Sequence, residues 1–169
     1  MKRIELKELR RIFRKLKPER VLLVSSADEN GKANVMTVEW FMRTSFDPPM
    51  VAVSIGKTRY THELIKKTKE FVVAFPKSEM GREAIYCGTY SGREVDKIKN
   101  AGLKTRKSVF VKPPLIENCV LNLECSVVNE IETGDHTIFI GKVLAAHYEE
   151  GEILIEFENK FCGVSDLKK

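Results

Sequence analysis

Two long stretches in the second half of the chain constrain its fold most. Residues 119–131 and 137–148 alternate between apolar and polar side chains or run apolar, and Glu132-Thr133-Gly134-Asp135 separates them. Extended runs joined by a short glycine-containing turn predict a long antiparallel β-hairpin. Parallel strands need a crossover of a dozen or more residues, so a pair joined this tightly argues against a doubly wound α/β sheet.

The remaining strand signals also come mostly as hairpins. A turn at Asp28-Glu29-Asn30-Gly31 joins two of them, and Asp47-Pro48-Pro49 predicts an extended corner before the next. These signals favour a mainly β fold, closed into an antiparallel barrel. Apolar or alternating composition predicts the strands at residues 21–26, 33–41, 50–55, 70–75 and 153–157.

Helices are expected at the periphery of this barrel. The pattern over residues 5–16 predicts an amphipathic helix that packs its apolar face on another surface and ends before Pro18. Its apolar residues, at helical spacing, are Leu6, Leu9, Ile12, Phe13 and Leu16. Further helices are expected over residues 58–69, 78–87 and 93–101.

The composition is that of a single globular domain spanning residues 1–169, with 43% hydrophobic and 31% charged residues. Lysine and arginine exceed aspartate and glutamate by 29 to 24, a net charge of +5. Such an excess attracts nucleic acid or anionic lipid, but it equally suits a protein that handles an anionic cofactor. Net charge therefore does not decide between these partners.

The four cysteines form no C-x-x-C pair and show no zinc-ligand spacing, which favours reduced, packed thiols over disulfides or a metal site. Residues 1–3 lead into an amphipathic pattern rather than a signal peptide. No run approaches the ~20 apolar residues that a membrane-spanning helix needs. We therefore expect a cytoplasmic protein with no bound metal and no membrane partner.

One motif lies where a predicted buried strand meets a predicted helix, at Ser54-Ile55-Gly56-Lys57-Thr58. A P-loop would need another glycine five positions before Gly56, and that position is Val51, inside the strand. The sequence therefore excludes this type of triphosphate site. The Rossmann fingerprint is also absent, because Gly81, Gly88 and Gly92 lack G-x-G-x-x-G spacing.

A site for a single phosphate remains at this strand-to-helix junction. The first backbone N–H groups of a helix have no intrahelical partners, and the helix dipole favours an anion beside them. Lys57 and Arg59 add two positive charges, and Ser54, Ile55 and Gly56 supply a hydroxyl and a backbone that can approach closely. The alternative is an ordinary turn whose two cations are solvated.

An aromatic and amide-bearing segment precedes this junction. On a regular strand over residues 33–41, Asn34, Met36 and Trp40 share one face. Met and Trp are commonly core residues, so this face could be structural. Asn34 suits a dry core poorly unless its amide is paired, and the donors and acceptors of a flavin edge would pair it.

Four motifs together resemble those of the flavin reductase-like family, the FMN-binding split barrels that include flavoredoxins and archaeal ferric reductases. They are N-x-M-T-x-x-W from Asn34, S-x-G-K-x-R-x-T-H from Ser54, S-G-R-x-x-D-K from Ser91, and the hairpin turn Gly134-Asp135-His136. The resemblance covers most of the chain. It implies an antiparallel split barrel of Greek-key type with peripheral α-helices, and a homodimer with the flavin site near the subunit interface.

The resemblance also implies roles for individual residues. Asn34, Thr37 and Trp40 would line the flavin pocket, while Ser54, Lys57, Arg59 and Thr61 would serve the phosphate and ribityl chain. Lys97 and His136 would close the site, with Phe161 stacked near the ring. Without the resemblance, Lys97 reads as a solvated lysine and His136 as an exposed histidine.

Three other reactive residues receive structural interpretations. His62 and His147 have no companion metal ligands in the sequence. Cys87, which precedes Gly88 near the expected site, could be a redox thiol, but burial accounts for it more simply.

These observations predict an FMN-dependent oxidoreductase in which the bound FMN, rather than a catalytic side chain, carries the chemistry. NADH, NADPH or a redox partner protein would supply electrons, and free flavin, a ferric complex or a redox protein would accept them. One alternative is a flavin- or pyridoxal-phosphate-related barrel without turnover. Another is nucleic-acid binding through the first helix and Lys104-Thr105-Arg106-Lys107, although we expect no nucleic-acid partner.

Overall fold

A computed structural model describes residues 3–13 and 15–168, with Arg10 and Lys168 described for the backbone only. Its largest sheet has seven strands in the order β3-β2-β6-β9-β10-β5-β4, and every neighbouring pair is antiparallel. This confirms the predicted mainly β, antiparallel fold with helices at its periphery. The strands are β2 (Leu22–Ala27), β3 (Ala33–Val38), β4 (Phe41–Phe46), β5 (Pro49–Gly56), β6 (Glu70–Pro76), β9 (Cys119–Thr133) and β10 (His136–Tyr148).

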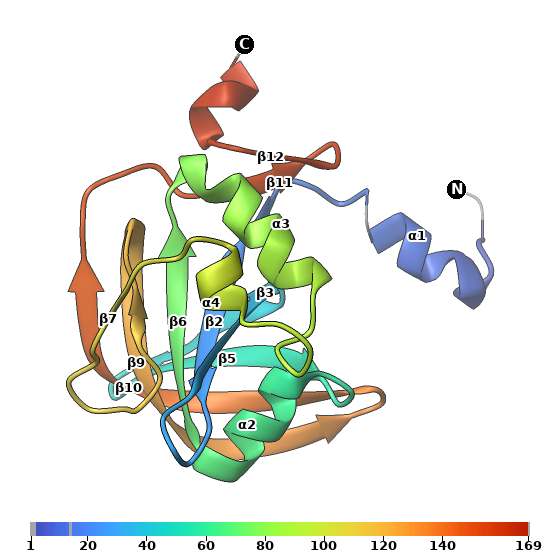
Figure 1. Ribbon diagram of the computed structural model, residues 1–169. Coiled ribbons are helices and arrows are strands. Elements are labelled where there is room, and N and C mark those ends of the chain that lie inside the picture. The colour runs from blue at the N-terminus through green and yellow to red at the C-terminus, as the bar shows by residue number, and fades with distance from the viewer. Residues whose placement is uncertain (1–2, 14, 169) are drawn as a thin grey trace.

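The predicted long hairpin is present as β9 and β10, whose pairing runs from His136↔Thr133 to Tyr148↔Leu121. Gly134 at its tip has a φ of 38°, in the left-handed region that glycine adopts at little cost. Register shifts near Gly141 and Leu144 bend the ladder. In Figure 1 the sheet curves strongly, with β2 and β6 upright and β5 running across them.

The expected closure of the barrel is wrong. A single strand was expected over residues 33–41, but the chain breaks at Glu39 and Trp40 into β3 and β4. These are the two edge strands of the sheet, and no ladder joins them within residues 3–13 and 15–168. The predicted alternation placed Trp40 on the face of Asn34 and Met36, whereas Trp40 lies outside both strands.

The corner expected at Asp47-Pro48-Pro49 is instead a tight turn between β4 and β5, with Phe46 opposite Pro49. The Asp47–Pro48 peptide bond is cis. Neither proline interrupts a ladder, because Pro48 lies in the turn and Pro49 is the first residue of β5, where a missing N–H is tolerated. The two prolines therefore permit a tight turn at this position, but the pattern of apolar residues does not predict one.

Two small sheets and the helices complete the fold. The helices α3 (Gly81–Thr89) and α4 (Lys97–Asn100) lie beside β2 and β3 on one side of the curved sheet, and α2 (Tyr60–Thr68) lies at its lower end (Figure 1). The remaining strands are β1 (Glu19–Arg20), β11 (Ile155–Phe157) and β12 (Lys160–Cys162) in one sheet, and β7 (Thr105–Arg106) and β8 (Leu115–Ile116) in another. The helices are α1 (Leu9–Phe13), α2 (Tyr60–Thr68), α3 (Gly81–Thr89) and α4 (Lys97–Asn100), with 3-10 turns at Leu6–Glu8, Ser78–Met80 and Val164–Lys168.

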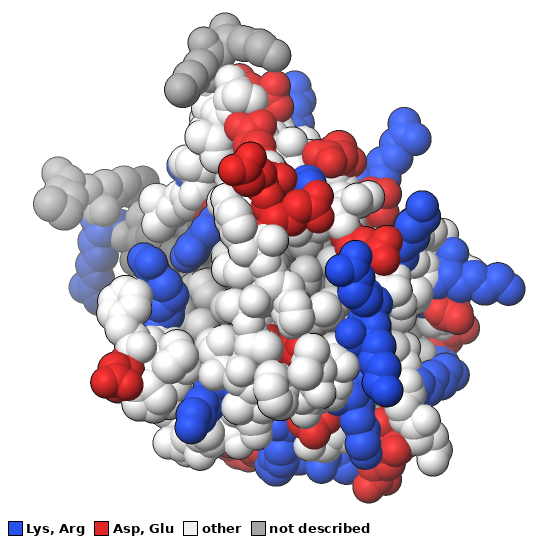
Figure 2. All heavy atoms as spheres, turned by 90° about the vertical axis from the view of Figure 1, so that its left-hand side faces the viewer, with Lys and Arg blue, Asp and Glu red and all other residues white. Residues whose placement is uncertain are grey.

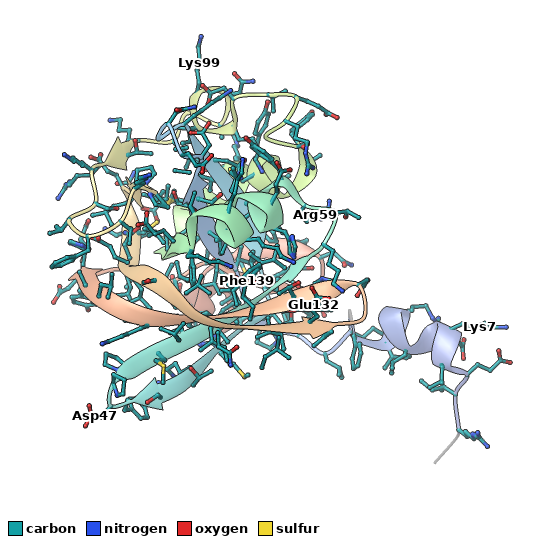
Figure 3. All side chains as sticks on the ribbon, turned by 90° about the horizontal axis from the view of Figure 1, so that it is seen from below. Lys7, Asp47, Arg59, Lys99, Glu132 and Phe139 are labelled. Atoms are coloured by element: carbon teal, nitrogen blue, oxygen red, sulfur yellow. The ribbon has the colours of Figure 1, made fainter. Side chains whose placement is uncertain are left out.

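The main apolar core lies between α2 and the inner face of the sheet. Ile65 of α2 is fully buried among Phe71, Val73 and Phe139, and Figure 3 shows Phe139 at the centre of this region. A second cluster lies beneath α3, where Ala84 packs with Leu23 and other strand residues. The two clusters hold β3 and the start of α2 in fixed positions.

The predicted first helix is shorter than expected and its apolar face is not covered. Leu6, Phe13 and Leu16 are 86%, 54% and 62% exposed, and α1 stands apart from the body of the molecule in Figure 1. Within the described residues, the chain itself does not cover these three side chains. Over the described ranges, no helix combines the length and the apolar character needed to cross a bilayer.

Candidate functional site

The predicted phosphate junction is a tight turn between β5 and α2. The N–H of Arg59 donates to the carbonyl of Gly56 at 3.0 Å, and the N–H of Lys57 donates to the carbonyl of Asp135 at 2.9 Å. Two of the amides expected to face an anion are therefore already engaged. The nine-residue α2 begins at Tyr60 without a side-chain cap, so the N–H groups of Tyr60 and Thr61 remain available at its positive end.

The tip of the long hairpin supports this turn. His136 is the register partner of Gly56, and Lys57 forms an ion pair with Glu132 at 3.2 Å. Deeper in, His62 Nε2 lies 2.8 Å from Thr137 Oγ1, linking the first turn of α2 to β10. Figure 3 shows Arg59 and Glu132 at the same end of the molecule. Segments about 75 residues apart therefore meet at this turn.

Two aromatic rings adjoin the turn. The indole of Trp40 and the imidazole of His136 have centroids 4.6 Å apart and planes inclined by 33°. A Cβ placed on Gly56 would lie at an ordinary contact distance of 3.6 Å from His136 Nε2, so the turn adjoins this ring. Trp40 is 55% exposed, and its carbonyl accepts a hydrogen bond from the Ser54 N–H at 3.0 Å. The pair therefore offers an accessible aromatic surface beside the turn.

A hollow of about 250 Å³ adjoins the start of α2. We call it the Thr37 hollow, and Thr37 and Met36 of β3 form one wall. Five residues predicted from the sequence to bind cofactor line it together, namely Met36, Thr37, Arg59, Thr61 and Lys97. The hydroxyl of Thr37 donates to the carbonyl of Ala84 at 2.5 Å, which ties this wall to α3.

Lys97 is the most unusual residue of this hollow. It is 5% exposed, and its Nζ donates to the carbonyl of Cys87 at 3.0 Å. Burial lowers the pKa of Lys97, and the charge of nearby Arg59 lowers it further against the opposing effect of Cys87. The interpretation of Lys97 as a solvated lysine is therefore wrong. A buried ammonium with donors to spare favours an anionic ligand.

Asn34 lies deeper than the hollow. It is 4% exposed, and its Nδ2 donates to the hydroxyl of Thr61 at 2.8 Å and lies 3.4 Å from that of Ser26. Its Oδ1 is buried without a hydrogen-bond partner among the residues that the structure describes. A Cβ on Gly92 would lie 2.0 Å from this oxygen, so only glycine fits at that position.

Like Asn34, Trp40, Gly56 and His136, four further predicted residues lie outside the Thr37 hollow. Ile55 is fully buried in the core, so only its backbone could face a ligand. Ser54 is half-buried beside the Trp40 backbone, and Lys57 is exposed and paired with Glu132. Phe161 lies on β12, where it packs against the core beneath α3 and approaches the start of that helix.

Arg93 has contacts that sequence reasoning did not assign. Its guanidinium donates to the carbonyl of Thr58 at 3.2 Å and to Glu63 at 2.9 Å, and it lies 5.2 Å from the centroid of the Tyr60 ring. Arg93 thus ties the segment after α3 to the start of α2. The S-G-R motif marked this arginine, whose guanidinium carries several donors, but not the partners that it meets.

The chain matches the flavin reductase like domain over residues 14–165. It belongs to the flavin reductase-like domain family. An uncharacterized protein of Archaeoglobus fulgidus is 45% identical over 137 residues, which are 81% of this chain and 75% of that protein. Family membership confirms the resemblance noted in the sequence and makes this chain a flavin-related oxidoreductase.

Two solved structures share the fold. The flavoredoxin of Methanosarcina acetivorans is 33% identical with a TM-score of 0.79, covering 88% of this chain and 86% of that one. The NADH:FAD oxidoreductase SgcE6 of Streptomyces globisporus C-1027 is 25% identical with a TM-score of 0.85, covering 95% and 96%. The antiparallel fold and its peripheral helices are therefore those of flavin reductase-like proteins.

Proposed function

We propose that this flavin reductase-like protein binds FMN non-covalently within a single domain and transfers electrons through it. One observation carries the proposal: the Gly56–Arg59 turn, with the start of α2, adjoins both the Trp40–His136 ring pair and the Thr37 hollow. An anion-binding helix start beside an aromatic surface offers a place for each of the two ends of a flavin mononucleotide.

The residues present fit such a cofactor. The phosphate would meet the N–H groups of Tyr60 and Thr61 and the side chains of Arg59 and Lys97, with Lys57 and Ser54 at the turn. The ring would lie among Met36, Thr37, Trp40 and His136. Asn34 supports the site by holding the hydroxyl of Thr61. For Phe161 to stack on the ring it would have to leave its present packing against the core beneath α3.

FMN, when bound, would supply hydride acceptance and one- or two-electron release. The chain's own contributions are binding and electrostatics. Arg59 and Lys97 offset the charge of the phosphate, and Lys97 is held in place by the carbonyl of Cys87. His136 Nδ1 lies 2.7 Å from Asp135 Oδ1, which fixes the imidazole against Trp40. No side chain is assigned a covalent role, and burial raises the pKa of the Cys87 thiol to about 11, which disfavours a thiolate there.

The decisive experiment is a titration of the purified, flavin-free protein with FMN, followed by the absorbance shift of the bound flavin. Anaerobic mixing of the loaded protein with NADH and with NADPH then tests whether either nucleotide bleaches the flavin. Rapid bleaching indicates a reductase, whereas bleaching only by a reduced partner protein indicates a carrier of the flavoredoxin type. The absence of any absorbance shift with FMN would contradict the proposal.

A homodimer forms part of this proposal. Side chains alternate along the strands, so Met42, Ala52 and Ile140, which are register neighbours, face away from the core residue Phe139. Met42 is 55% exposed and Ile131, on the same outer face, is 44% exposed. A second copy covering this face would lie beside Trp40. Light scattering of the wild type and of Met42→Glu tests the interface, and an unchanged dimer in the variant would rule it out.

The rival interpretations predict different measurements. A cofactor-binding barrel without turnover would bind FMN but show no reduction by any donor. For nucleic-acid binding, the face in Figure 2 shows Lys and Arg interspersed with Asp and Glu around a broad uncharged area, rather than one continuous basic surface. A salt-dependent shift with DNA or RNA would support that rival. The cytoplasmic location and the choice of terminal acceptor stay predictions.

A further inference from the structure

The excess positive charge of the protein lies in its first seventeen residues. This segment, residues 1–17, which we call the N-terminal arm, contains eight lysines and arginines and two glutamates, a net charge of +6. The whole chain carries +5, so residues 18–169 together carry −1. The basic character of the protein is therefore a property of the arm and not of the part of the chain that holds the candidate flavin site.

The arm also has an apolar face. Successive residues of a helix are rotated by about 100°, so its five spaced apolar residues fall within one arc of about 120°. They are Leu6, Leu9, Ile12, Phe13 and Leu16. The coil formed by the first 3-10 turn and α1 continues to the end of this set, because the Leu16 N–H donates to the Phe13 carbonyl at 3.0 Å. Three of the five side chains are more than half exposed.

Cationic side chains follow the opposite face of the arm. Lys7, Arg11 and Lys15 are exposed and recur at four-residue spacing, so they lie along one side of the coil. Lys7 pairs with Glu5 at 2.7 Å and Arg11 with Glu8 at 3.2 Å, and both pairs are largely exposed. Exposed pairs hold their cations weakly, so these charges can exchange to another anion.

The arm is fixed at its base and free along its length. The ammonium of Lys17 lies 2.8 Å from the carboxylate of Glu156 and 3.2 Å from that of Glu39, which attaches the end of the arm to the body. Figure 1 shows α1 standing apart from the sheets and the other helices, and in Figure 3 Lys7 is directed away from them. Both faces of the arm are therefore accessible to a partner.

We infer that the N-terminal arm is an interfacial helix that docks the protein on an anionic lipid surface. A helix of this kind lies in the plane of the membrane surface, with its apolar face among the headgroups and acyl chains and its lysines and arginines on the polar face. Clusters of such cations are attracted to anionic headgroups. The expectation of no membrane partner was drawn from the lack of a spanning segment, whereas this helix would lie on the surface. The inference does not depend on the proposed flavin function.

Charge and apolar exposure together favour lipid over other partners. A second copy of this chain would cover the apolar face, but its residues 18–169 together carry −1, which does not balance the +6 of the arm. A nucleic acid would neutralise the cations but leave Leu6, Phe13 and Leu16 in water. An anionic bilayer satisfies both faces at once.

Co-sedimentation of the full chain with vesicles tests the docking. We expect vesicles that mix phosphatidylglycerol with phosphatidylcholine to bind the protein at least about tenfold more tightly than vesicles of phosphatidylcholine alone, and added salt to weaken that binding. Phe13→Glu/Leu16→Glu should reduce the binding about tenfold or more. The matched control Val109→Glu/Phe110→Glu makes the same change at side chains that are 67% and 61% exposed on another loop, and should bind like wild type.

The cations are tested separately. Lys7→Glu/Lys15→Glu should also weaken binding to the anionic vesicles about tenfold or more, whereas Lys104→Glu/Lys160→Glu, at exposed lysines outside the arm, should have a much smaller effect. All four variants change exposed side chains, so we expect thermal midpoints near wild type and FMN affinities within about twofold of it. Loss of FMN binding would therefore concern the flavin proposal and not the arm.

Several outcomes would overturn the inference. Equal binding to neutral and anionic vesicles, or equal effects of the arm and control variants, would do so. If the arm variants lower the mass measured by light scattering and leave vesicle binding unchanged, a second copy covers the arm instead. If the protein ignores vesicles but shifts DNA or RNA in a salt-dependent way that Lys7→Glu/Lys15→Glu abolishes, the arm binds nucleic acid.

Discussion

The imidazole of His136 packs on the indole of Trp40 at a centroid distance of 4.6 Å, although 96 positions of sequence separate the two residues. Trp40 occupies the break between the two edge strands, and His136 begins β10 at the tip of the long hairpin. Their contact joins the two parts of the chain that border the Gly56–Arg59 turn. The arrangement makes the only tryptophan of the protein a reporter on the candidate site.

We expect FMN to quench the fluorescence of Trp40 as it binds. Replacing the ring by Trp40→Leu should lower the affinity for FMN about tenfold, which corresponds to ~1.4 kcal/mol of lost aromatic contact. Because Trp40 is 55% exposed, the variant should keep a near-wild-type midpoint of thermal unfolding. Tyr148→Leu, which removes a 72% exposed ring from the far end of β10, is the control. Equal FMN affinities for both variants would remove Trp40 from the site.

One lysine and three glutamates form a cluster at the bend that contains Glu39. The ammonium of Lys17 lies 3.3, 3.2 and 2.8 Å from the carboxylates of Glu19, Glu39 and Glu156. Burial raises the pKa of Glu39 to about 8, with hydrogen bonds to the other two carboxyls acting in the same direction and Lys17 opposing them. One positive charge among three carboxyls thus favours a retained proton at neutral pH.

This cluster should make stability fall as the pH rises. The folded-state pKa of Glu39 lies above its unfolded value, so its contribution is complete below the unfolded pKa and is lost as the pH rises through about 8. We expect Glu39→Gln to be more stable than wild type above that pH, by a difference on the order of 1 kcal/mol. Urea unfolding between pH 5 and pH 9 measures it, with Glu150→Gln as the exposed control. A difference that does not change with pH would contradict the interpretation.

Glu124 should behave in the opposite sense. It is fully buried, and its carboxylate accepts the backbone N–H groups of Val109 and Phe110 and lies 2.8 Å from His147 Nε2. Burial raises the pKa of Glu124, but these hydrogen bonds outweigh burial, so the pKa is lowered. The stabilisation is therefore present above the unfolded pKa and is lost as the pH falls through the folded one.

We expect Glu124→Gln to cost ~2–4 kcal/mol of unfolding free energy at neutral pH, because an amide cannot accept all three donors equally well. The cost should shrink in acid, where the wild-type carboxylate is protonated. Denaturant midpoints at neutral and acid pH test both statements, with Glu79→Gln as an exposed control. A cost that grows toward acid pH would show that the hydrogen bonds do not stabilise the ionised form.

The thiols provide a fourth test. Burial raises the pKa of Cys119 and Cys125 to about 12 and that of Cys87 to about 11, whereas Cys162 is half-buried. A thiol reagent should therefore modify one cysteine per chain rapidly in the native protein and the other three only after unfolding. Cys162→Ser should abolish the rapid phase. A rapid phase that survives this change and disappears in Cys87→Ser would restore the redox-thiol interpretation.

Elements with a long apolar pattern were predicted more accurately from the sequence than short elements and breaks. The β9–β10 hairpin was predicted closely because its apolar pattern extends over many residues and its turn carries a glycine at positive φ. The break at Glu39 and Trp40 was missed, because alternation continues through it and only the tertiary pairing of β4 with β5 reveals it. The helix predicted over residues 93–101 begins only at Lys97, where the Asp96 carboxylate caps the chain.

The site was predictable where local chemistry defined it. The start of α2 could be recognised because a glycine and two cations followed an apolar run. The burial of Lys97 could not, since a lysine in a charged segment usually lies in solvent and the covering residues come from α3. The orphan oxygen of Asn34 depends on the approach of Gly92, 58 positions away, and no local pattern encodes such a contact.

The absence of a ladder between β3 and β4 in the described residues affects how this part of the chain would recognise a heterocyclic ring. In a fully closed barrel, the backbone amides and carbonyls of these strands would be engaged with one another. Here the two edges converge at Glu39 and Trp40 without a shared ladder in the described parts of the chain. The free edges of two such strands present backbone N–H and C=O groups that no ladder pairs. These groups can form hydrogen bonds with a heterocyclic ring whose edge carries both donors and acceptors. Side-chain substitutions there would leave this main-chain surface intact, so selectivity for the ring would survive changes that weaken its affinity.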